Sequence, residues 1–341
     1  MVSRQDVADR AGVSAAVVSY VLNNRNIVKE TTRQKVLEAV LELNYKPNLL
    51  ARSLKTKKSK QIVVLVQFLG NPFEAGILLR IESVAKENGY FVFFQTYEET
   101  REEQLQELYM GRVDGILLLG QSLKESTIEH FSAMGIPIVS IMEPAKRLQL
   151  DGVVDIDWID AMRQLVRHLK QYGHERIAFM SGGSGNHHYE CRFRSFLEAL
   201  TIEGMLFHSG DKLEDPGRFE SAHAQMKQRL EQTEGRLPFQ ALICANDLMA
   251  AGSLAACREL GIEVPGTLSI AGCEDILMSS QTYPPLTVIH FPRPEAAEQA
   301  TYQLLSRMEG REPPSETERM LVGALVIRDS TGRRLQNTVV E

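Results

Sequence analysis

The sequence predicts an α/β protein with two parts: an N-terminal all-α helix-turn-helix headpiece and a two-lobe core of doubly wound parallel sheets. Helical patterns fill residues 1–47, and no strand-like run occurs among them. From residue 61 onward, short apolar runs alternate with amphipathic stretches long enough for helices. Strands that are buried on both faces give such apolar runs. The number of strand–helix units is too large for one sheet, which predicts two lobes.

The first helix begins after Ser3. Ser3 and Asp6 stand at the spacing of a capping box, in which each side chain bonds the backbone N–H of the other residue. An apolar stripe that includes Val7 and Ala8 follows, and Gly12 then ends the helix. The stripe predicts one face turned toward a small core.

A second short helix is predicted over residues 15–23. Ser14 is placed to cap it, and either Val17 or Val18 faces inward with the apolar residues one turn further on. Two short helices joined at a glycine-containing turn predict a helix-turn-helix, whose second helix enters the major groove of DNA with its N-terminus first. The outward residues are then Ser14, Ala15, Ala16, Ser19 and Tyr20.

A third amphipathic helix, from about Thr31 to Asn44, closes the core of the headpiece, and Pro47 prevents its continuation. Residues 1–60 contain 12 Lys and Arg against 5 Asp and Glu, although the whole chain carries a net charge of −6. A basic end on an acidic body is typical of a chain that binds phosphates at one end only. The alternative is an ordinary solvated basic face.

Composition places the chain among globular proteins. It has 341 residues, 43% of them hydrophobic. No apolar run approaches the roughly 20 residues that a membrane span needs. The N-terminus is a polar helix rather than a signal peptide, so we expect a cytoplasmic protein that associates with the nucleoid when it is bound to DNA.

Cysteines and histidines do not predict a metal site. His187 and His188 with Cys191 could ligate a borderline metal, but one loop supplies at most three ligands and no complementary cluster follows elsewhere. We therefore expect neither a metal nor another cofactor. The cysteines show no Cys-x-x-Cys pair, which predicts free buried thiols at Cys191, Cys244, Cys257 and Cys273.

Seven strands are predicted in the core, at residues 62–66, 90–94, 115–119, 137–141, 177–180, 241–244 and 268–271. Between several of them a glycine stands where a helical stretch ends and a left-handed cap is needed: Gly89, Gly135, Gly173 and Gly261. In open α/β sheets, ligands bind beyond the carboxyl ends of the strands. Residues that directly follow each strand are therefore expected to line a cleft between the lobes.

Polar and aromatic side chains occupy these positions. Asn71 and Phe73 follow the first strand, and a glycine-rich loop after the strand at 177–180 leads into Arg192. Asn246 and Glu274 follow the last two predicted strands. Arg192 is the strongest candidate for a ligand contact, because its planar fork of donors suits vicinal hydroxyls or a carboxylate.

Together these features resemble the lactose-repressor (LacI/GalR) family of bacterial transcription regulators, over essentially the whole chain. The resemblance implies a periplasmic-binding-protein-like core, in which the chain crosses between the lobes near residues 157–162, 288–292 and 318–324. The motifs that carry it are Asp6-Val7-Ala8, Ala11-Gly12-Val13-Ser14, Val18-Ser19, Val21-Leu22-Asn23, Thr32-Arg33, Asn44-Tyr45, Pro47-Asn48 and Ala51-Arg52-Ser53-Leu54.

The resemblance also implies the order of the domains. We expect a DNA-binding headpiece at residues 1–47, a hinge helix or linker at 48–60, and a C-terminal tail at 331–341. The effector-binding and dimerisation core is expected at 61–330. Within it, the N-lobe is expected at about 61–159 and 291–320, and the C-lobe at about 160–290 and 321–330.

In that family the segment after the proline becomes a helix only on operator DNA, where two such helices pair in the minor groove. By position, Leu54 resembles the family's apolar wedge between base steps. Ala15 and Ala16 offer contact with thymine methyls at most, so base specificity is expected to depend more on Ser14, Tyr20 and the wedge. The expected DNA-binding residues are Ser3, Ser14, Ala15, Ala16, Val17, Ser19, Tyr20, Asn23, Thr32, Asn48, Ala51, Arg52, Leu54 and Lys55.

Effector contacts are implied from both lobes. Arg192 begins a match to the family's Arg-x-x-Gly-Phe motif, with serine in place of the glycine. Met142, Asp157 and Glu274 depart from the usual residues, which indicates a pocket retuned from a simple neutral sugar toward a larger or partly apolar ligand. Alternatively, the polar residues only cap helices and bond across the lobe interface. The expected effector-binding residues are Asn71, Phe73, Met142, Asp157, Arg192, Phe219, Asn246 and Glu274.

These observations predict a sequence-specific DNA-binding regulator, expected to repress transcription as a homodimer on a pseudo-palindromic operator under control of a sugar or sugar derivative. By family position, residues 74–88 contribute to the dimer, and residues 325–341 lack the leucine heptads of a tetramer. A protein co-regulator in place of the small ligand is an open alternative. A solute-binding protein would need an export signal and no DNA-binding head. An enzyme would need a nucleophile, base or metal constellation, and none is assignable.

Overall fold

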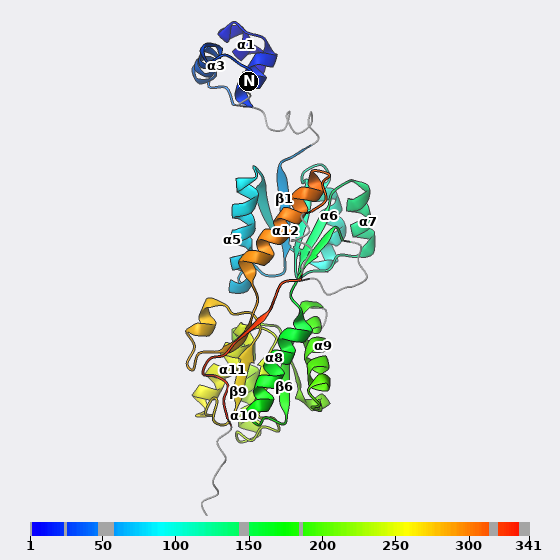
Figure 1. Ribbon diagram of the computed structural model, residues 1–341, viewed down its shortest axis with the longest axis vertical. Helices are drawn as coiled ribbons and strands as arrows, with labels where there is room; N and C mark the ends of the chain where they lie inside the picture. Colours follow the sequence, from blue (N-terminus) through cyan, green and yellow to red (C-terminus); the bar gives the residue numbers. More distant parts are fainter. Residues whose placement is uncertain are drawn as a thin grey trace, which may run out of the picture. The chain divides into compact units, whose positions relative to one another are not determined.

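The computed structural model describes residues 2–23, 26–46, 58–142, 150–183, 187–313 and 320–333. The chain divides into two compact units, residues 1–59 and residues 60–341 (Figure 1). Among the residues in these ranges, no helix has both the length and the apolar character required to cross a membrane.

The headpiece consists of three helices, α1 (Arg4–Ala11), α2 (Ala15–Leu22) and α3 (Glu30–Glu42). The predicted capping box is confirmed, because Ser3 and Asp6 each bond the backbone of the other, and Gly12 ends α1 at φ 65°. The three helices enclose a small apolar core of Val7, Ala8, Val18, Val21, Val36, Ala39 and Tyr45.

The other two headpiece helices differ from the prediction in detail. Ser14 caps α2 as predicted, and Val18 rather than Val17 is fully buried beneath it. α3 ends two residues earlier than expected. Asn44 takes the left-handed conformation there (φ 47°), and the next N–H, that of Tyr45, returns to the oxygen of Val40. Asparagine tolerates this cap conformation, which explains the early end.

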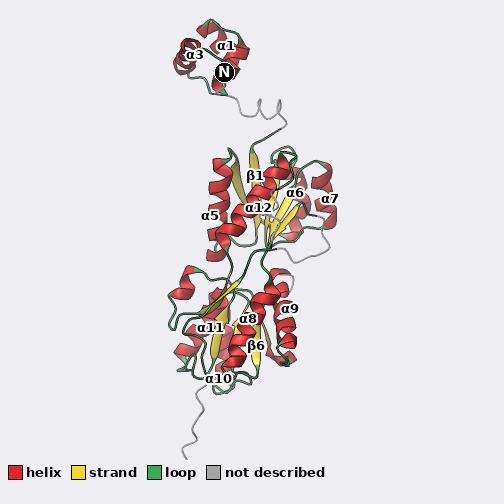
Figure 2. Ribbon diagram, in the orientation of Figure 1, coloured by secondary structure: helices red, strands yellow, loops and turns green. Residues whose placement is uncertain are grey.

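The N-lobe is a five-stranded parallel sheet in the order β2-β1-β3-β4-β5. Figure 2 shows its strands in yellow among the helices of this lobe. Its strands are β1 (Gln61–Val66), β2 (Phe91–Thr96), β3 (Gly115–Leu119), β4 (Ile138–Ile141) and β5 (Gly152–Val154). A helix from the far end of the sequence, α12, packs against α5 and against β3, β4 and β5. The helical segments of this lobe are α5 (Pro72–Glu87), η1 (Glu99–Arg101), α6 (Glu102–Tyr109), α7 (Glu125–Ala133) and α12 (Arg293–Met308).

The C-lobe is a six-stranded sheet in the order β11-β10-β9-β8-β6-β7, in which only the β10–β11 pairing is antiparallel among the described pairings. Its strands are β6 (Ile177–Gly182), β7 (Lys212–Asp215), β8 (Ala241–Cys244), β9 (Ser269–Gly272), β10 (Thr287–His290) and β11 (Ala324–Val326). Its helical segments are α8 (Trp158–Gln171), α9 (His187–Ile202), η2 (Ser209–Asp211), α10 (Phe219–Gln232), α11 (Asp247–Glu259) and η3 (Leu277–Ser280).

All seven predicted strands are confirmed to within two residues, as β1, β2, β3, β4, β6, β8 and β9. The four glycines take the predicted left-handed conformation, with φ between 69° and 85°. The sequence pattern does not predict β5, β7, β10 and β11. β5 and β11 have only three residues each, which is too short for a recognisable apolar run. β7 alternates exposed Lys212 and Glu214 with buried neighbours, so it is not a continuous apolar run either.

The chain passes between the lobes after β5, after β10 and again before β11, where Ile156 and Leu321 form a parallel bridge. Asp275 joins these crossings. Its carboxylate accepts from Arg328 (2.6 Å) and pairs with Nδ1 of His290 (2.8 Å), and its backbone oxygen accepts from Arg293 on α12 (2.7 Å). One residue of the C-lobe is thus bonded to the end of β10, to the segment after β11 and to a helix of the N-lobe.

Candidate effector site and nucleic-acid interface

The exposed surface of α2 contains fewer of the predicted outward residues than expected. Ser14, Ala16 and Tyr20 are exposed, and Ser19 is half-buried with its hydroxyl accepting from the amide of Asn23 (3.3 Å). The expectation that Ala15 faces outward is wrong in part, because its side chain packs against the headpiece core. The exposed side chains of this helix and its cap are thus small or hydroxyl-bearing, and their contact with DNA stays a prediction.

The remaining expected DNA-binding residues fall into two groups. In the headpiece, Ser3 is exposed in its capping box, and Val17 and Thr32 are half-buried. The hinge residues lie outside the described residues, so their roles stay predictions: Asn48, Ala51, Arg52, Leu54 and Lys55.

Arg192 lies at the centre of a buried cluster between the lobes. Its side chain is fully buried, donates to the backbone oxygen of Ala245 and is paired with Oε1 of Glu274 (3.2 Å). Nη2 also approaches Sδ of Met142 across the lobe junction (3.7 Å). The guanidinium lies 4.4 Å from the ring centroid of Trp158. A cation enclosed in this way is held by one carboxylate and by aromatic faces.

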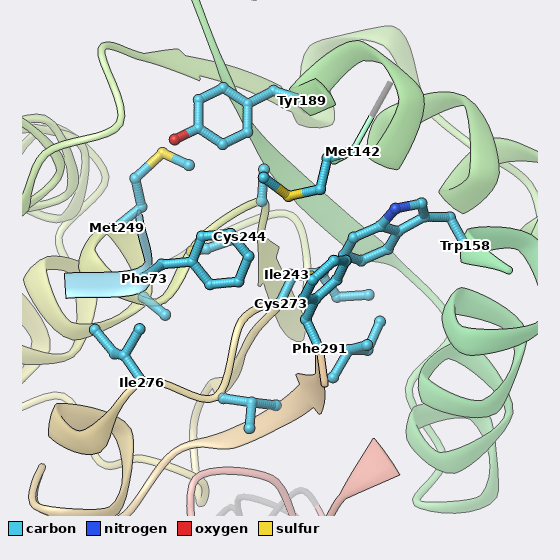
Figure 3. Close-up of a cluster of buried hydrophobic side chains, with 14 of the residues drawn as sticks. Phe73, Met142, Trp158, Tyr189, Ile243, Cys244, Met249, Cys273, Ile276 and Phe291 are labelled. Atoms are coloured by element: carbon cyan, nitrogen blue, oxygen red, sulfur yellow. The ribbon is translucent and has the colours of Figure 1, made fainter. Parts of the chain in front are cut away.

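Aromatic side chains from both lobes surround this centre. Figure 3 shows Phe73, Trp158 and Tyr189 around Met142. The Arg192 guanidinium is 5.8 Å from the ring centroids of both Phe73 and Tyr189. Phe73 comes from α5 of the N-lobe, and Trp158 and Tyr189 come from α8 and α9 of the C-lobe.

Two buried carboxylates face the same centre. Glu274 is 1% exposed, and burial raises its pKa to about 7 although Arg192 opposes the shift. Glu74, in the first turn of α5, is 6% exposed and accepts from the N–H of Phe68 (3.3 Å). Burial raises the pKa of Glu74 to about 8, and the charge of Glu274 adds to this shift. Neutral pH is therefore close to the titration range of both groups.

Two polar atoms of the cluster are unsatisfied. Within the described ranges, neither Nε of Arg192 nor Oε2 of Glu274 has a hydrogen-bond partner. Buried donors and acceptors are normally paired, so an unpartnered donor and acceptor in one cluster indicate a place where a ligand or water bonds.

The loop that carries Glu274 is fixed by Asp247. This fully buried carboxylate accepts from the backbone N–H groups of Glu274 and Ile276 (3.0 Å each) and from the hydroxyl of Ser279. Its neighbour Asn246 caps α11 and donates to the hydroxyl of Tyr189 (2.8 Å). Asp247 therefore fixes the loop that carries Glu274, and Asn246 fixes the hydroxyl of Tyr189.

The structure brings together five of the expected effector residues: Phe73, Met142, Arg192 and Glu274, with Asn246 joined through Tyr189. Asn71 caps α5 beside Phe73 (3.0 Å). Asp157 and Phe219 are not in this cluster. Asp157 is exposed and caps α8, and Phe219 stacks on His223 at the start of α10. For the three caps, the helix-capping alternative describes what their side chains do here.

Sequence reasoning does not find Glu74, Trp158 and Tyr189. An acid in the first turn of a helix is ordinary, because it complements the helix dipole, so nothing distinguishes Glu74 by pattern. Trp158 is the single tryptophan of the chain and stands at a predicted crossing, which is a usable signal. Tyr189 lies in a helix and offers none.

Two further contacts join the lobes, through His188 and through Arg218. His188 Nδ1 lies 3.3 Å from the oxygen of Gly120, and the guanidinium of Arg218 lies 5.1 Å from the ring centroid of Phe68. Burial, followed by the charge of Arg192, lowers the pKa of His188 to about 3, so this ring is neutral. Each of these contacts joins the C-lobe to the N-lobe.

A polar cavity of about 200 Å³ lies at the carboxyl edge of the N-lobe sheet and reaches α9 of the C-lobe. In this part of the chain, Nε2 of Gln121 and the hydroxyl of Ser122 are buried without a described partner. This cavity therefore has unsatisfied polar atoms in its wall. Its walls include Gln67, Tyr97, Glu102, Gln121, Ser122 and His187.

No group of three or more His, Cys, Asp and Glu side chains among the described residues is arranged to hold a metal ion. The four cysteines are free thiols, and three of them are buried. The cluster around Arg192 offers a ligand hydrogen bonding, charge and aromatic faces.

Comparison with known families covers both parts of the chain. Residues 4–48 match the model described as bacterial regulatory proteins, lacI family, and residues 166–331 match a periplasmic binding protein-like domain. The chain is similar to the HTH-type transcriptional repressor PurR of Glaesserella parasuis serovar 5 (strain SH0165), with 32% identity over 320 residues and 93% of each chain covered. It is also similar to the HTH-type transcriptional repressor CytR of Escherichia coli (strain K12), with 32% identity over 331 residues, 96% of this chain and 95% of that one.

Solved structures match over the same extent. The lac repressor dimer bound to operator and the anti-inducer ONPF is 27% identical, with a TM-score of 0.82, and the match covers 97% of this chain and 99% of that one. The complex of the transcriptional regulator CelR with cellobiose is 26% identical, with a TM-score of 0.70, and the match covers 97% of this chain and all of that one.

Proposed function

Because this chain belongs to the lacI family of bacterial regulatory proteins, we propose that it represses transcription as a homodimer on a pseudo-palindromic operator, under control of a small polar effector. The effector is a sugar or sugar derivative bound between the lobes. The observation that carries the effector proposal is the buried Arg192–Glu274 pair with its two unsatisfied atoms. The relatives PurR and CytR are repressors, so we propose no catalytic role and place its action on cytoplasmic DNA.

Exposed apolar side chains support the homodimer. Leu79 on α5 is 73% exposed, and Phe91 on the edge strand β2 is 66% exposed. In the C-lobe, Leu277 and Tyr283 are 80% and 79% exposed. Contiguous exposed apolar surface is typical of a binding surface, and the elements that carry Leu79 and Phe91 pack against each other. A second copy of the chain would cover them and would supply the second headpiece that a pseudo-palindromic site requires.

Tyr20 is predicted to read base edges. We expect Tyr20→Ala to weaken binding to the operator by about 1–3 kcal/mol while binding to random duplex changes little, because phosphate contacts carry the non-specific affinity. The operator is first selected from a random duplex library with the full chain, and an inverted repeat is expected from two identical heads. Leu41→Ala is the matched control, since this side chain on α3 is 79% exposed and points away from the core. Equal losses on operator and random DNA would assign Tyr20 a phosphate or packing role, and a selected site without symmetry would argue against the homodimer.

A bound effector should change operator affinity. We expect one member of a panel of neutral sugars, amino sugars, sugar phosphates, sugar acids and nucleosides to raise the unfolding temperature of the full chain. The same compound should change operator affinity by about 1–3 kcal/mol, and operator should change its affinity equally, because the coupling is reciprocal. A compound that stabilises the protein without changing operator affinity would contradict control from this site.

A protein co-regulator is the second candidate. Arg192 and Glu274 already form an ion pair with each other without a ligand. This observation favours the protein co-regulator. If no compound of the panel stabilises the chain and operator affinity responds only to a cell protein, control by a small effector is replaced by control through the exposed surface.

A further inference from the structure

The cluster between the lobes contains two acidic side chains and one basic side chain. The acidic side chains are Glu74 and Glu274, and the basic one is Arg192. Among the described contacts, Arg192 forms an ion pair with Glu274 and not with Glu74. Asp247, also buried, is already satisfied by three donors from its own lobe. Burying two carboxylates against one guanidinium leaves one carboxylate without a counter-charge, which is costly in a dry interior.

The other arginines near Glu74 are engaged elsewhere. Arg293 on α12 donates to the backbone oxygen of Asp275 and lies 5.9 Å from the ring centroid of Phe73. Arg218 lies over the ring of Phe68. The counter-charge for Glu74 is therefore not supplied by these side chains, and Glu74 is held as the neutral acid, its pKa raised to about 8.

The walls of the cluster suit a cation. The rings of Phe73, Trp158 and Tyr189 already enclose one guanidinium at 4.4 to 5.8 Å, which shows that their faces tolerate a positive group. Oε2 of Glu274, 1% exposed and unpartnered within the described chain, is an acceptor that a charged N–H donor would satisfy.

We propose that the effector carries a protonated amine, which binds between Glu74 and the free oxygen of Glu274 against these aromatic rings. This inference rests on the proposed function, because it names the class of effector for the same inter-lobe site. The class is an amino sugar or another amine of similar size. Sugar phosphates and sugar acids are disfavoured, because their negative charge would lie beside the Glu274 carboxylate and would oppose ionisation of Glu74. Arg192 is fully buried here, so the ligand enters when the lobes separate.

The test compares ligands that differ in one group. Thermal unfolding and calorimetry of the full chain are measured with D-glucosamine against D-glucose, D-galactosamine against D-galactose, and putrescine against 1,4-butanediol, with glucose 6-phosphate as the anion. We expect at least one amine to bind tenfold or more tightly than its hydroxyl twin. The proposal is overturned if a hydroxyl compound binds more tightly than its amine twin, or if glucose 6-phosphate binds more tightly than the amines. It is also overturned if none of the amines binds.

A variant tests the carboxylate itself. Glu74→Gln keeps the shape of the neutral acid but cannot become negative, so we expect it to fold and to lose most of the preference for the amine. Glu82→Gln, an exposed position on the same helix, is the matched control and should keep that preference. An unchanged preference in Glu74→Gln overturns the role of Glu74.

The outcomes also separate this inference from the proposed function. If a neutral sugar binds and changes operator affinity, the repressor and its effector site stand while the amine does not. If no compound binds but operator is still bound, the small effector itself fails.

Discussion

Replacement of Arg192 by leucine should lower the free energy of unfolding of the core by about 3–5 kcal/mol, because it leaves the buried carboxylate of Glu274 without its partner. Such a loss is a large share of the stability of an ordinary domain. Urea denaturation followed by the fluorescence of Trp158 measures it directly. This single tryptophan lies against the Arg192 guanidinium and is 5% exposed, so it reports on the lobe junction.

Replacing both Arg192 and Glu274 should lower the free energy of unfolding by less than the sum of the two single replacements. In Arg192→Leu with Glu274→Leu, no buried charge is left unpaired, and apolar replacements of buried pairs are often close to neutral. Arg167→Leu is the control, because this side chain is 46% exposed and an ion pair open to solvent is worth less than about 1 kcal/mol. Additive losses, or a loss below about 1 kcal/mol in Arg192→Leu, would show that the pair contributes little. Any effector defect in an Arg192 variant must be compared with its stability.

Raising the pH from 6.5 to 8.5 should destabilise the ligand-free core by about 2–3 kcal/mol. The pKa values of Glu74 and Glu274 are raised from 4.5 to about 8 and about 7. In this range the folded state therefore holds protons that the unfolded state has released, so stability falls as the pH rises through the folded pKa values. His188 has the opposite sign, because its pKa is lowered to about 3. The unfolded ring is half protonated at pH 6.5, so this group offsets only about 0.4 kcal/mol of the decline.

The measurement is the urea midpoint and slope at several pH values in this range. Glu74→Gln should reduce the decline to about 1 kcal/mol or less, because only Glu274 remains to titrate. A wild-type protein whose stability does not change with pH would show that these carboxylates are solvated. An equal decline in the variant would assign the effect to other groups.

The headpiece and the strand–helix order of the core follow from sequence because they depend on local rules. Capping residues, left-handed glycines and apolar runs are read within a few neighbouring residues, and Ser3, Ser14 and Gly12 do what those rules predict. β7 and β11 do not, because a short edge strand needs little apolar surface and takes its position from its neighbour in the sheet.

The candidate site is predictable only in part for a related reason. Phe73, Arg192 and Glu274 follow strands, and that position alone indicates a cleft residue. The role of Glu74 depends on which side chain faces it from the other lobe, and closure of the lobes decides that. Asp157 follows a strand as well, yet its carboxylate bonds the first N–H groups of α8, because a local partner is always within reach.

The late position of α12 and β11 has a consequence for synthesis. α12 packs on the sheet of the N-lobe, and β10 and β11 complete the sheet of the C-lobe, so neither lobe is finished until nearly the whole chain has left the ribosome. The headpiece has its own core within its first 45 residues. Domains fold as units during translation, from the N-terminus onward. A nascent chain thus acquires its DNA-binding end before the part that controls it, and a prematurely terminated product would keep the headpiece without the control.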